Sequence, residues 1–192
     1  MLKVLLTIFV IITLTVSCAP TGRYQQHKDS VPTRKPTAAE LKDITPRAEK
    51  KSRGGNKNYT VRGKYYQVLE SAENFKETGI ASFYAEKFHG HLTSNGEIFN
   101  MYSMSAAHKN LPLPSYVKVT NLKNNRSTIV RVNDRGPFHE GRIIDLSYAA
   151  ATKLDVSKTG TANVKIEHIT TAQAPSPKAT QHYAIQVAAS SN

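Results

Sequence analysis

Between residues 79 and 169 the sequence is a series of short segments in which apolar and polar residues alternate. The alternation is clearest in residues 117–122, 128–132 and 163–169, and two further strands are expected at residues 80–84 and 142–145. A period of two places one face of each strand in a core and the other face in solvent. Many short strands with one or two small helices favour a compact, mainly β barrel over a parallel α/β sheet.

Turn residues separate these segments. Asn95-Gly96 suits a tight turn that needs positive φ, residues 123–126 suit a hairpin, and Gly136-Pro137 interrupts the following segment. One short helix is expected at residues 148–154, because Ser147 is a favourable N-cap and three alanines follow it.

The N-terminus predicts export. Lys3 precedes an apolar run over residues 4–16, which is long enough for the core of a signal peptide and short for a membrane span. The run ends at Cys18 in a pattern that resembles a lipoprotein cleavage site, so residues 1–17 are expected to be a lipoprotein signal peptide and Cys18 to carry the lipid. An ordinary signal peptide followed by an incidental cysteine is the alternative. A lipid on Cys18 places the protein in the envelope facing the periplasm, and Ala19 favours the outer membrane of a Gram-negative bacterium.

Positive charge is concentrated behind this segment. The chain of 192 residues has a net charge of +12, and residues 19–64 hold twelve Lys and Arg against four Asp and Glu. In an exported protein this cluster indicates anionic lipid headgroups or cell-wall carboxylates rather than nucleic acid, or else a linker extended by its own charge. With few aromatic or aliphatic residues, residues 18–58 are expected to be the acylated N-terminus and a disordered basic linker.

The rest of the chain divides by composition. Residues 59–78 are expected to form a lead-in hairpin that turns at Gly63-Lys64, before the barrel at residues 79–169 and a polar linker at residues 170–181. The single cysteine excludes an internal disulfide framework and a zinc site of paired cysteines. No cofactor or metal is expected, and zinc at His89-Gly90-His91 is the alternative that the spacing leaves open.

Blocks of sequence in the barrel region resemble the rare lipoprotein A family. They are GIASFY (79–84), KFHG (87–90), TSNGE (93–97), AAH (106–108), LPLP (111–114), RVNDRGPF (131–138) and RIIDLS (142–147). The resemblance implies a six-stranded double-psi β-barrel at residues 79–169 that acts as a peptidoglycan lytic transglycosylase. It also implies a preference for glycan stripped of its peptides, and action with division proteins in daughter-cell separation. Residues 182–192 are similar to the first strand of a SPOR domain, a glycan-binding module, and are expected to be either a truncated remnant of such a domain or an adventitious match.

By motif position, the resemblance implies that Glu97, His108 and Asp134 are active-site residues. Cleavage between N-acetylmuramic acid and N-acetylglucosamine needs a carboxylic acid to protonate the leaving oxygen. In a lytic transglycosylase the muramic C6 hydroxyl then attacks, which gives a 1,6-anhydro product without consuming water. Asp134 is expected to act as acid and then as base. Glu97 is expected to raise the pKa of Asp134 or stabilise positive charge, and His108 to orient a carboxylate.

Each of these residues also has a structural interpretation. Asp134 fits a side chain that binds turn amides, Glu97 a solvated hairpin charge, and His108 a packed imidazole. Asp145 is expected to be structural, capping the helix or pairing with Arg142 or Arg135.

Further side chains of these blocks are expected to bind the sugar, namely Tyr84, Phe88, Asn133, Arg135 and Phe138, with Tyr116 as another aromatic platform. In a small barrel such aromatic residues also serve as core. Phe83 stands where the family commonly has Trp, which implies weaker sugar stacking.

Two classes of function follow. The first is an enzyme, a lytic transglycosylase that uses Asp134 and Glu97. The second is a non-catalytic wall-binding or division-associated module, since the same barrel in plant expansins loosens polysaccharide without evident hydrolysis.

Overall fold

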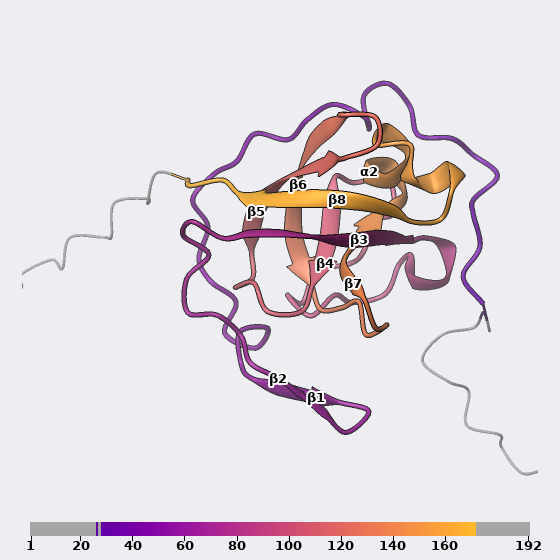
Figure 1. The fold of residues 1–192 in the computed structure, drawn as a ribbon. Coiled ribbons are helices and arrows are strands. Elements are labelled where there is room, and N and C mark those ends of the chain that lie inside the picture. Colours follow the sequence, from indigo (N-terminus) through magenta and orange to yellow (C-terminus); the bar gives the residue numbers. More distant parts are fainter. Residues whose placement is uncertain (1–25, 27, 172–192) are drawn as a thin grey trace, which may run out of the picture.

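A closed six-stranded barrel forms the centre of the molecule in the computed structural model, which describes residues 26 and 28–171 (Figure 1). Its strands are β3 (Lys76–Tyr84), β4 (Ser105–His108), β5 (Ser115–Asn121), β6 (Ser127–Asp134), β7 (Arg142–Ser147) and β8 (Ala162–His168). They follow each other around the barrel in the order β3-β7-β4-β6-β5-β8. The pairs β3/β7 and β4/β6 are parallel and the other pairs are antiparallel. The prediction of a mainly β, six-stranded barrel is confirmed.

Alternating side chains fill the barrel. The inward residues of four strands are fully buried, namely Val117, Val119, Val130, Val132, Ile144, Leu146, Val164 and Ile166. Strand β4 was not predicted, because all four residues of its Ser-Ala-Ala-His segment are buried and no alternation marks it. Strand β3 begins at Lys76, four residues before the predicted start, and β6 continues to Asp134.

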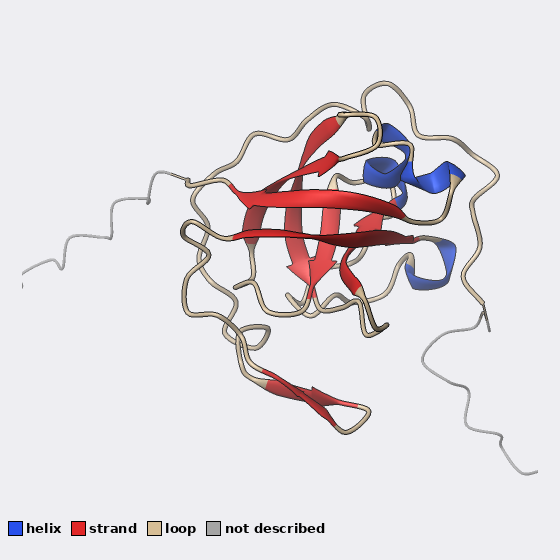
Figure 2. Ribbon diagram, viewed as in Figure 1, coloured by secondary structure: helices blue, strands red, loops and turns tan. Residues whose placement is uncertain are grey.

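Short helical segments lie to one side of the strands in the view of Figure 2. Helix α2 (Tyr148–Lys153) begins where predicted, and the Ser147 side chain accepts a hydrogen bond from the Ala150 amide at 3.3 Å. Two 3-10 turns, η1 (Glu86–Phe88) and η2 (Val156–Lys158), follow β3 and α2.

A separate two-stranded hairpin, β1 (Tyr59–Val61) and β2 (Lys64–Tyr66), projects from the barrel (Figure 1). It turns at Arg62-Gly63, one residue earlier than predicted. Both turn residues have positive φ, of 50° and 76°, which is the backbone of a tight two-residue hairpin turn.

Residues 28–58 run along the outside of the barrel as an N-terminal strap (Figure 1). The described residues of this strap form neither strand nor α-helix, yet their side chains bind the barrel at several points. Asp29 accepts hydrogen bonds from the Ala85 and Lys87 amides at 2.8 and 2.9 Å. Asp43 accepts one from the Thr128 hydroxyl at 2.6 Å. The prediction of a disordered linker over residues 18–58 rested on composition, and for the strap it was wrong. Composition does not show these contacts, because the partner residues lie far along the chain.

Several predictions concern residues outside the described range. They include the signal peptide, the lipid on Cys18, most of the linker at residues 170–181, and the SPOR-like segment at residues 182–192. Within residues 26 and 28–171, no helix has the length and apolar character needed to cross a membrane.

Candidate active site

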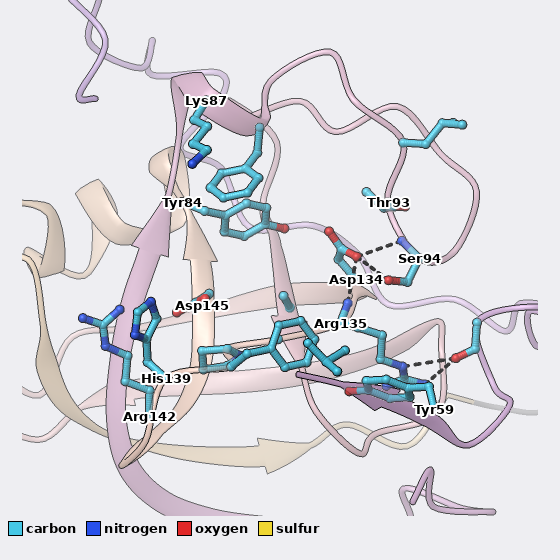
Figure 3. A pocket seen from close by; sticks show the side chains of 18 of the residues that line it. Tyr59, Tyr84, Lys87, Thr93, Ser94, Asp134, Arg135, His139, Arg142 and Asp145 are labelled. Atoms are coloured by element: carbon cyan, nitrogen blue, oxygen red, sulfur yellow. Dashed lines mark hydrogen bonds between the residues drawn. The ribbon is translucent and has the colours of Figure 1, made fainter. Parts of the chain in front are cut away.

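An open cavity of about 870 Å³ lies at one end of the barrel (Figure 3). The ends of β3, β6 and β7 form its floor, and the loops after η1 and β6 form its sides. Three aspartates line it, Asp29, Asp134 and Asp145, together with the backbone of Gly136. Both oxygens of Asp29 accept hydrogen bonds from backbone amides, those of Ala85 and Lys87.

Asp134 is the last residue of β6, and its carboxylate is held on one oxygen. The Oδ1 atom accepts hydrogen bonds from the Ser94 amide at 2.8 Å, the Ser94 hydroxyl at 2.7 Å and the Arg135 amide at 2.8 Å. These three hydrogen bonds fix the orientation of the Asp134 carboxyl group at the end of β6.

Asp145 is another carboxyl group of this cavity. It lies on β7 directly beside Ser82 of β3, and the Ser82 hydroxyl donates a hydrogen bond to its Oδ1 atom. Arg142 in turn donates to the Ser82 hydroxyl at 3.1 Å. Burial raises the pKa of Asp145, although Ser82, Arg142 and His139 act against that rise. Asp145 is thus the carboxyl group of this cavity that is best suited to hold a proton.

The second oxygen of Asp145 faces the space above Gly136. A Cβ atom at Gly136 would lie 3.8 Å from Asp145 Oδ2, and the φ of +137° at this glycine is one that L side chains rarely adopt. The missing side chain leaves Oδ2 open toward the cavity. The sequence-based interpretation gave Asp145 a structural role because it lies just before the N-cap of the helix. Its place beside Ser82 could not be read from the sequence, because β3 and β7 are distant along the chain.

Glu97 does not line this cavity. Arg131 donates to both of its oxygens, at 2.6 and 2.8 Å, and Asn133 Nδ2 donates at 2.9 Å. The hydrogen bonds from Arg131 lower the pKa of Glu97 to about 2. Glu97 is therefore ionised at neutral pH, and it supports the loop that carries Ser94 to Asp134.

His108 lies beneath the cavity with 2% of its surface exposed. Its Nδ1 atom accepts hydrogen bonds from the Asn110 and Leu111 amides, both at 3.1 Å, and its Nε2 atom lies 3.1 Å from Glu77 Oε2. Burial lowers the pKa of His108. The neutral ring thus donates from Nε2, and the backbone carbonyl of His108 accepts a hydrogen bond from Arg135 at 3.1 Å.

Four of the five expected sugar-binding side chains line the cavity: Tyr84, Phe88, Arg135 and Phe138. The ring of Tyr84 stacks on Phe99 with centroids 4.1 Å apart. Its hydroxyl is buried, and burial raises the pKa of Tyr84. The phenol therefore stays protonated.

Several of the predicted site residues, Arg135 of the cavity among them, have partners within the protein. Asn133 is buried and binds Glu97. The Arg135 guanidinium donates to the backbone carbonyls of Gly55, at 2.7 Å, and Leu111, at 2.6 Å. Tyr116 donates to Glu49 at 2.5 Å, away from the cavity. His89 Nδ1 accepts a hydrogen bond from the Met101 amide at 3.2 Å. In the described part of the chain, no three His, Cys, Asp or Glu side chains are grouped to hold a metal ion.

Comparison with known proteins identifies the family. Residues 76–166 match the family model described as lytic transglycolase. The endolytic peptidoglycan transglycosylase RlpA of Vibrio cholerae is 52% identical over 193 residues, covering 98% of this chain and 73% of the relative. Its namesake in Pseudomonas aeruginosa is 50% identical over 149 residues, covering 77% of this chain and 43% of the relative. The chain belongs to the RlpA family of endolytic peptidoglycan transglycosylases, which confirms the resemblance seen in the sequence.

Solved structures match more distantly. A Streptomyces papain inhibitor is 23% identical over 50% of this chain, with a TM-score of 0.40 and 96% of the inhibitor covered.

Proposed function

We propose that this chain cleaves the bond between N-acetylmuramic acid and N-acetylglucosamine in peptidoglycan, and releases a 1,6-anhydro-muramyl end. One observation carries the proposal: Asp134 and Asp145 line the same cavity, where three hydrogen bonds orient Asp134 and burial raises the pKa of Asp145. A carboxyl group whose pKa is raised by burial is suited to act as a general acid, and a second carboxyl group oriented in the same cavity can act as the base. Membership of the RlpA family supports the same reaction.

Asp145 is the proposed general acid. Its Oδ2 atom gives a proton to the glycosidic oxygen as the bond to the anomeric carbon of N-acetylmuramic acid breaks. The N-acetylglucosamine side of the strand leaves with the protonated oxygen as a free hydroxyl, and positive charge develops at the anomeric carbon. This divides between two residues the roles that sequence reasoning gave to Asp134 alone.

Asp134 is the proposed base. Its negative charge stabilises the oxocarbenium-like state, and it then takes the proton from the muramic C6 hydroxyl as that oxygen bonds to the anomeric carbon. No water is consumed, and transfer of the proton from Asp134 to Asp145 restores the starting state. Glu97 and His108 act as positioning residues through Ser94 and Arg135.

Glycan without stem peptides is the proposed form of the substrate. Removal of the peptide leaves a free lactyl carboxylate on each muramic residue. The side chains of Lys57, Arg62 and Arg142 line the cavity and add positive charge around its carboxylates. A peptide-free strand therefore offers charges that match the cavity rim.

The cellular setting belongs to the same proposal. The sequence pattern around Cys18 supports a lipid anchor in the outer membrane of a Gram-negative bacterium, and the resemblance of the sequence blocks supports action with division proteins in daughter-cell separation. The domain division also stands as proposed, with residues 79–169 as the catalytic barrel.

The test uses the full chain in mild detergent with intact sacculi and with sacculi stripped of peptides by an amidase. Released sugars are analysed by mass spectrometry for Asp134→Asn, Asp145→Asn and the unchanged chain. Anhydro-muramyl products that disappear in both variants support the proposal, and release from stripped sacculi alone supports the preference for peptide-free glycan. If nothing is released while the chain co-sediments with sacculi, the non-catalytic binding module becomes the better account.

A further inference from the structure

The hairpin β1/β2 forms part of the cavity although it precedes residues 76–166, the range of the family model. Val61 and Arg62 of the hairpin, with Lys57 just before it, line the same cavity as Asp134 and Asp145. A barrel without this hairpin would therefore lack one wall of the cavity.

Aromatic contacts fix the hairpin to the loop that follows β6. Tyr59 stacks on Tyr66 with centroids 5.2 Å apart, and Phe138 packs against these rings at 6.1 and 5.5 Å. The Tyr59 hydroxyl donates to the Lys109 carbonyl at 2.9 Å. Since Tyr59 packs against Tyr66 and Phe138 and is hydrogen-bonded at its hydroxyl, it serves as an anchor that places its neighbours.

The two faces of the hairpin differ. Val61, paired with Lys64, belongs to the face that borders the cavity, together with Tyr59. Thr60 pairs with Tyr65 on the opposite face, where Tyr65 is 62% exposed. Substitutions on the face away from the cavity can therefore serve as a control for substitutions on the face that borders it.

The cavity extends to both sides of its carboxylates. In Figure 3, Tyr84 and Lys87 lie toward one end, Tyr59 lies toward the other, and Asp134 and Asp145 lie between them on opposite sides. An extended ligand that passes between the two carboxylates therefore meets η1 at one end and the hairpin at the other.

We infer that the hairpin is a glycan-binding arm, which holds the sugar units on one side of the bond to be cut. This inference rests on the proposed transglycosylase function. Cleavage inside a strand requires sugars to be bound on both sides of the scissile bond, and the hairpin supplies the surface for one side. Val61 offers an apolar contact for a sugar ring face. Lys57 and Arg62 offer donors and positive charge for hydroxyl, acetamido and lactyl oxygens.

Binding measured against ligand length tests the arm. Isothermal titration of the full chain in mild detergent uses a peptide-free glycan disaccharide and an octasaccharide as probes, and every form that is titrated also carries Asp134→Asn so that the octasaccharide is not cut. The variant is Lys57→Ser with Arg62→Asn, because asparagine tolerates the positive φ at residue 62. The control is Thr60→Ser with Tyr65→Ser on the opposite face of the same hairpin.

The octasaccharide should bind the chain with an unaltered hairpin more tightly than the disaccharide does. The Lys57/Arg62 variant should lose roughly fivefold or more of this gain, as expected from two polar contacts, while the control keeps it. In strand cleavage the Lys57/Arg62 variant should raise KM with kcat nearly unchanged.

The inference is overturned if the variant keeps the whole gain, or if the control loses as much. These outcomes are distinct from failure of the proposed function, which shows as absence of anhydro-muramyl products from the unchanged chain. The binding measurement is independent of that result.

Discussion

Ser82 and Asp145 face each other across the parallel pair of strands β3 and β7, and the Ser82 hydroxyl donates to Asp145 Oδ1. Because Arg142 donates to the Ser82 oxygen, the serine proton is directed at the carboxyl group. One oxygen of Asp145 is thereby held in the barrel wall, and the other is left toward Gly136 and the cavity. Acid catalysis by Asp145 would depend on this orientation.

Asp145→Asn should lower kcat by roughly a hundredfold or more, since a general acid typically contributes at least that factor. The same change should raise the thermal midpoint at neutral pH by roughly a few degrees. Burial raises the pKa of Asp145 in the folded state, so the unchanged protein loses relative stability as pH rises from the unfolded pKa through the folded one. The midpoint difference between variant and parent should therefore grow with pH. Calorimetry across this range checks it, and an equal difference at every pH contradicts it.

Ser82→Ala tests the same carboxyl group without removing it. The Ser82 hydrogen bond lowers the pKa of Asp145, so its loss should raise that pKa further. A general acid works while protonated, so the alkaline limb of the kcat profile should move to higher pH. A limb that stays in place, measured on peptide-free glycan, would assign the proton donor to another group.

Ser94→Ala should lower kcat by about tenfold with little change in KM. It removes the hydroxyl that holds Asp134 Oδ1 at 2.7 Å and leaves the Ser94 amide in place. Asp134→Asn in parallel gives the full loss for comparison. A rise in KM with kcat unchanged for Ser94→Ala would instead place Ser94 among the groups that bind substrate.

Glu97→Gln should remove stability in a defined pH range. Arg131 lowers the folded pKa of Glu97 to about 2 from its ordinary value of 4.5. The contribution is therefore present above about 4.5 and is lost as pH falls toward 2. In thermal unfolding, the midpoint of the variant should lie below that of the parent at pH 6. The two midpoints should approach each other as pH falls toward 2, over the range in which the barrel stays folded. If Glu97→Gln leaves the midpoint unchanged at pH 6 but abolishes product release, Glu97 acts in the chemistry directly.

His108→Ala should destabilise the barrel by about 2–4 kcal/mol, because it removes a buried ring and leaves the Asn110 and Leu111 amides without their acceptor. The lowered pKa of His108 means that the folded state prefers the neutral ring. The unchanged protein should therefore lose stability as pH falls below the ordinary histidine range, and the variant should lose less. Urea unfolding at two pH values measures this, and a stable but inactive variant would contradict it.

Asp43→Ala tests whether the N-terminal strap contributes to folding. Asp43 accepts from the Thr128 hydroxyl at 2.6 Å and forms an ion pair with Lys153 at 2.9 Å. Loss of these contacts should cost about 1 kcal/mol, since the aspartate is half exposed. Lys42→Ala on the adjacent exposed position is the control. Equal unfolding midpoints for both variants would show that the strap adds nothing measurable.

Local pattern was sufficient for most of the barrel. Sequence pattern located five of its six strands, three of them by clear alternation, and the Ser147 cap located helix α2, because these signals depend on residues close together in the chain. Strand β4 has no such signal, since it is buried on both faces. The strap was also beyond this reasoning, because its polar side chains are ordered by partners more than fifty residues away.

For the site, blocks of motif residues were sufficient to recognise the family, and they drew attention to Asp134. Which acidic residues share a cavity could be seen only once the barrel had been described. Glu97 is bound to Arg131, His108 is buried, and Asp145 lies beside Ser82. The reason is physical: the protonation state of a carboxyl group depends on burial and on donors from other strands, and the crossed connections of this barrel bring those strands together from distant parts of the chain.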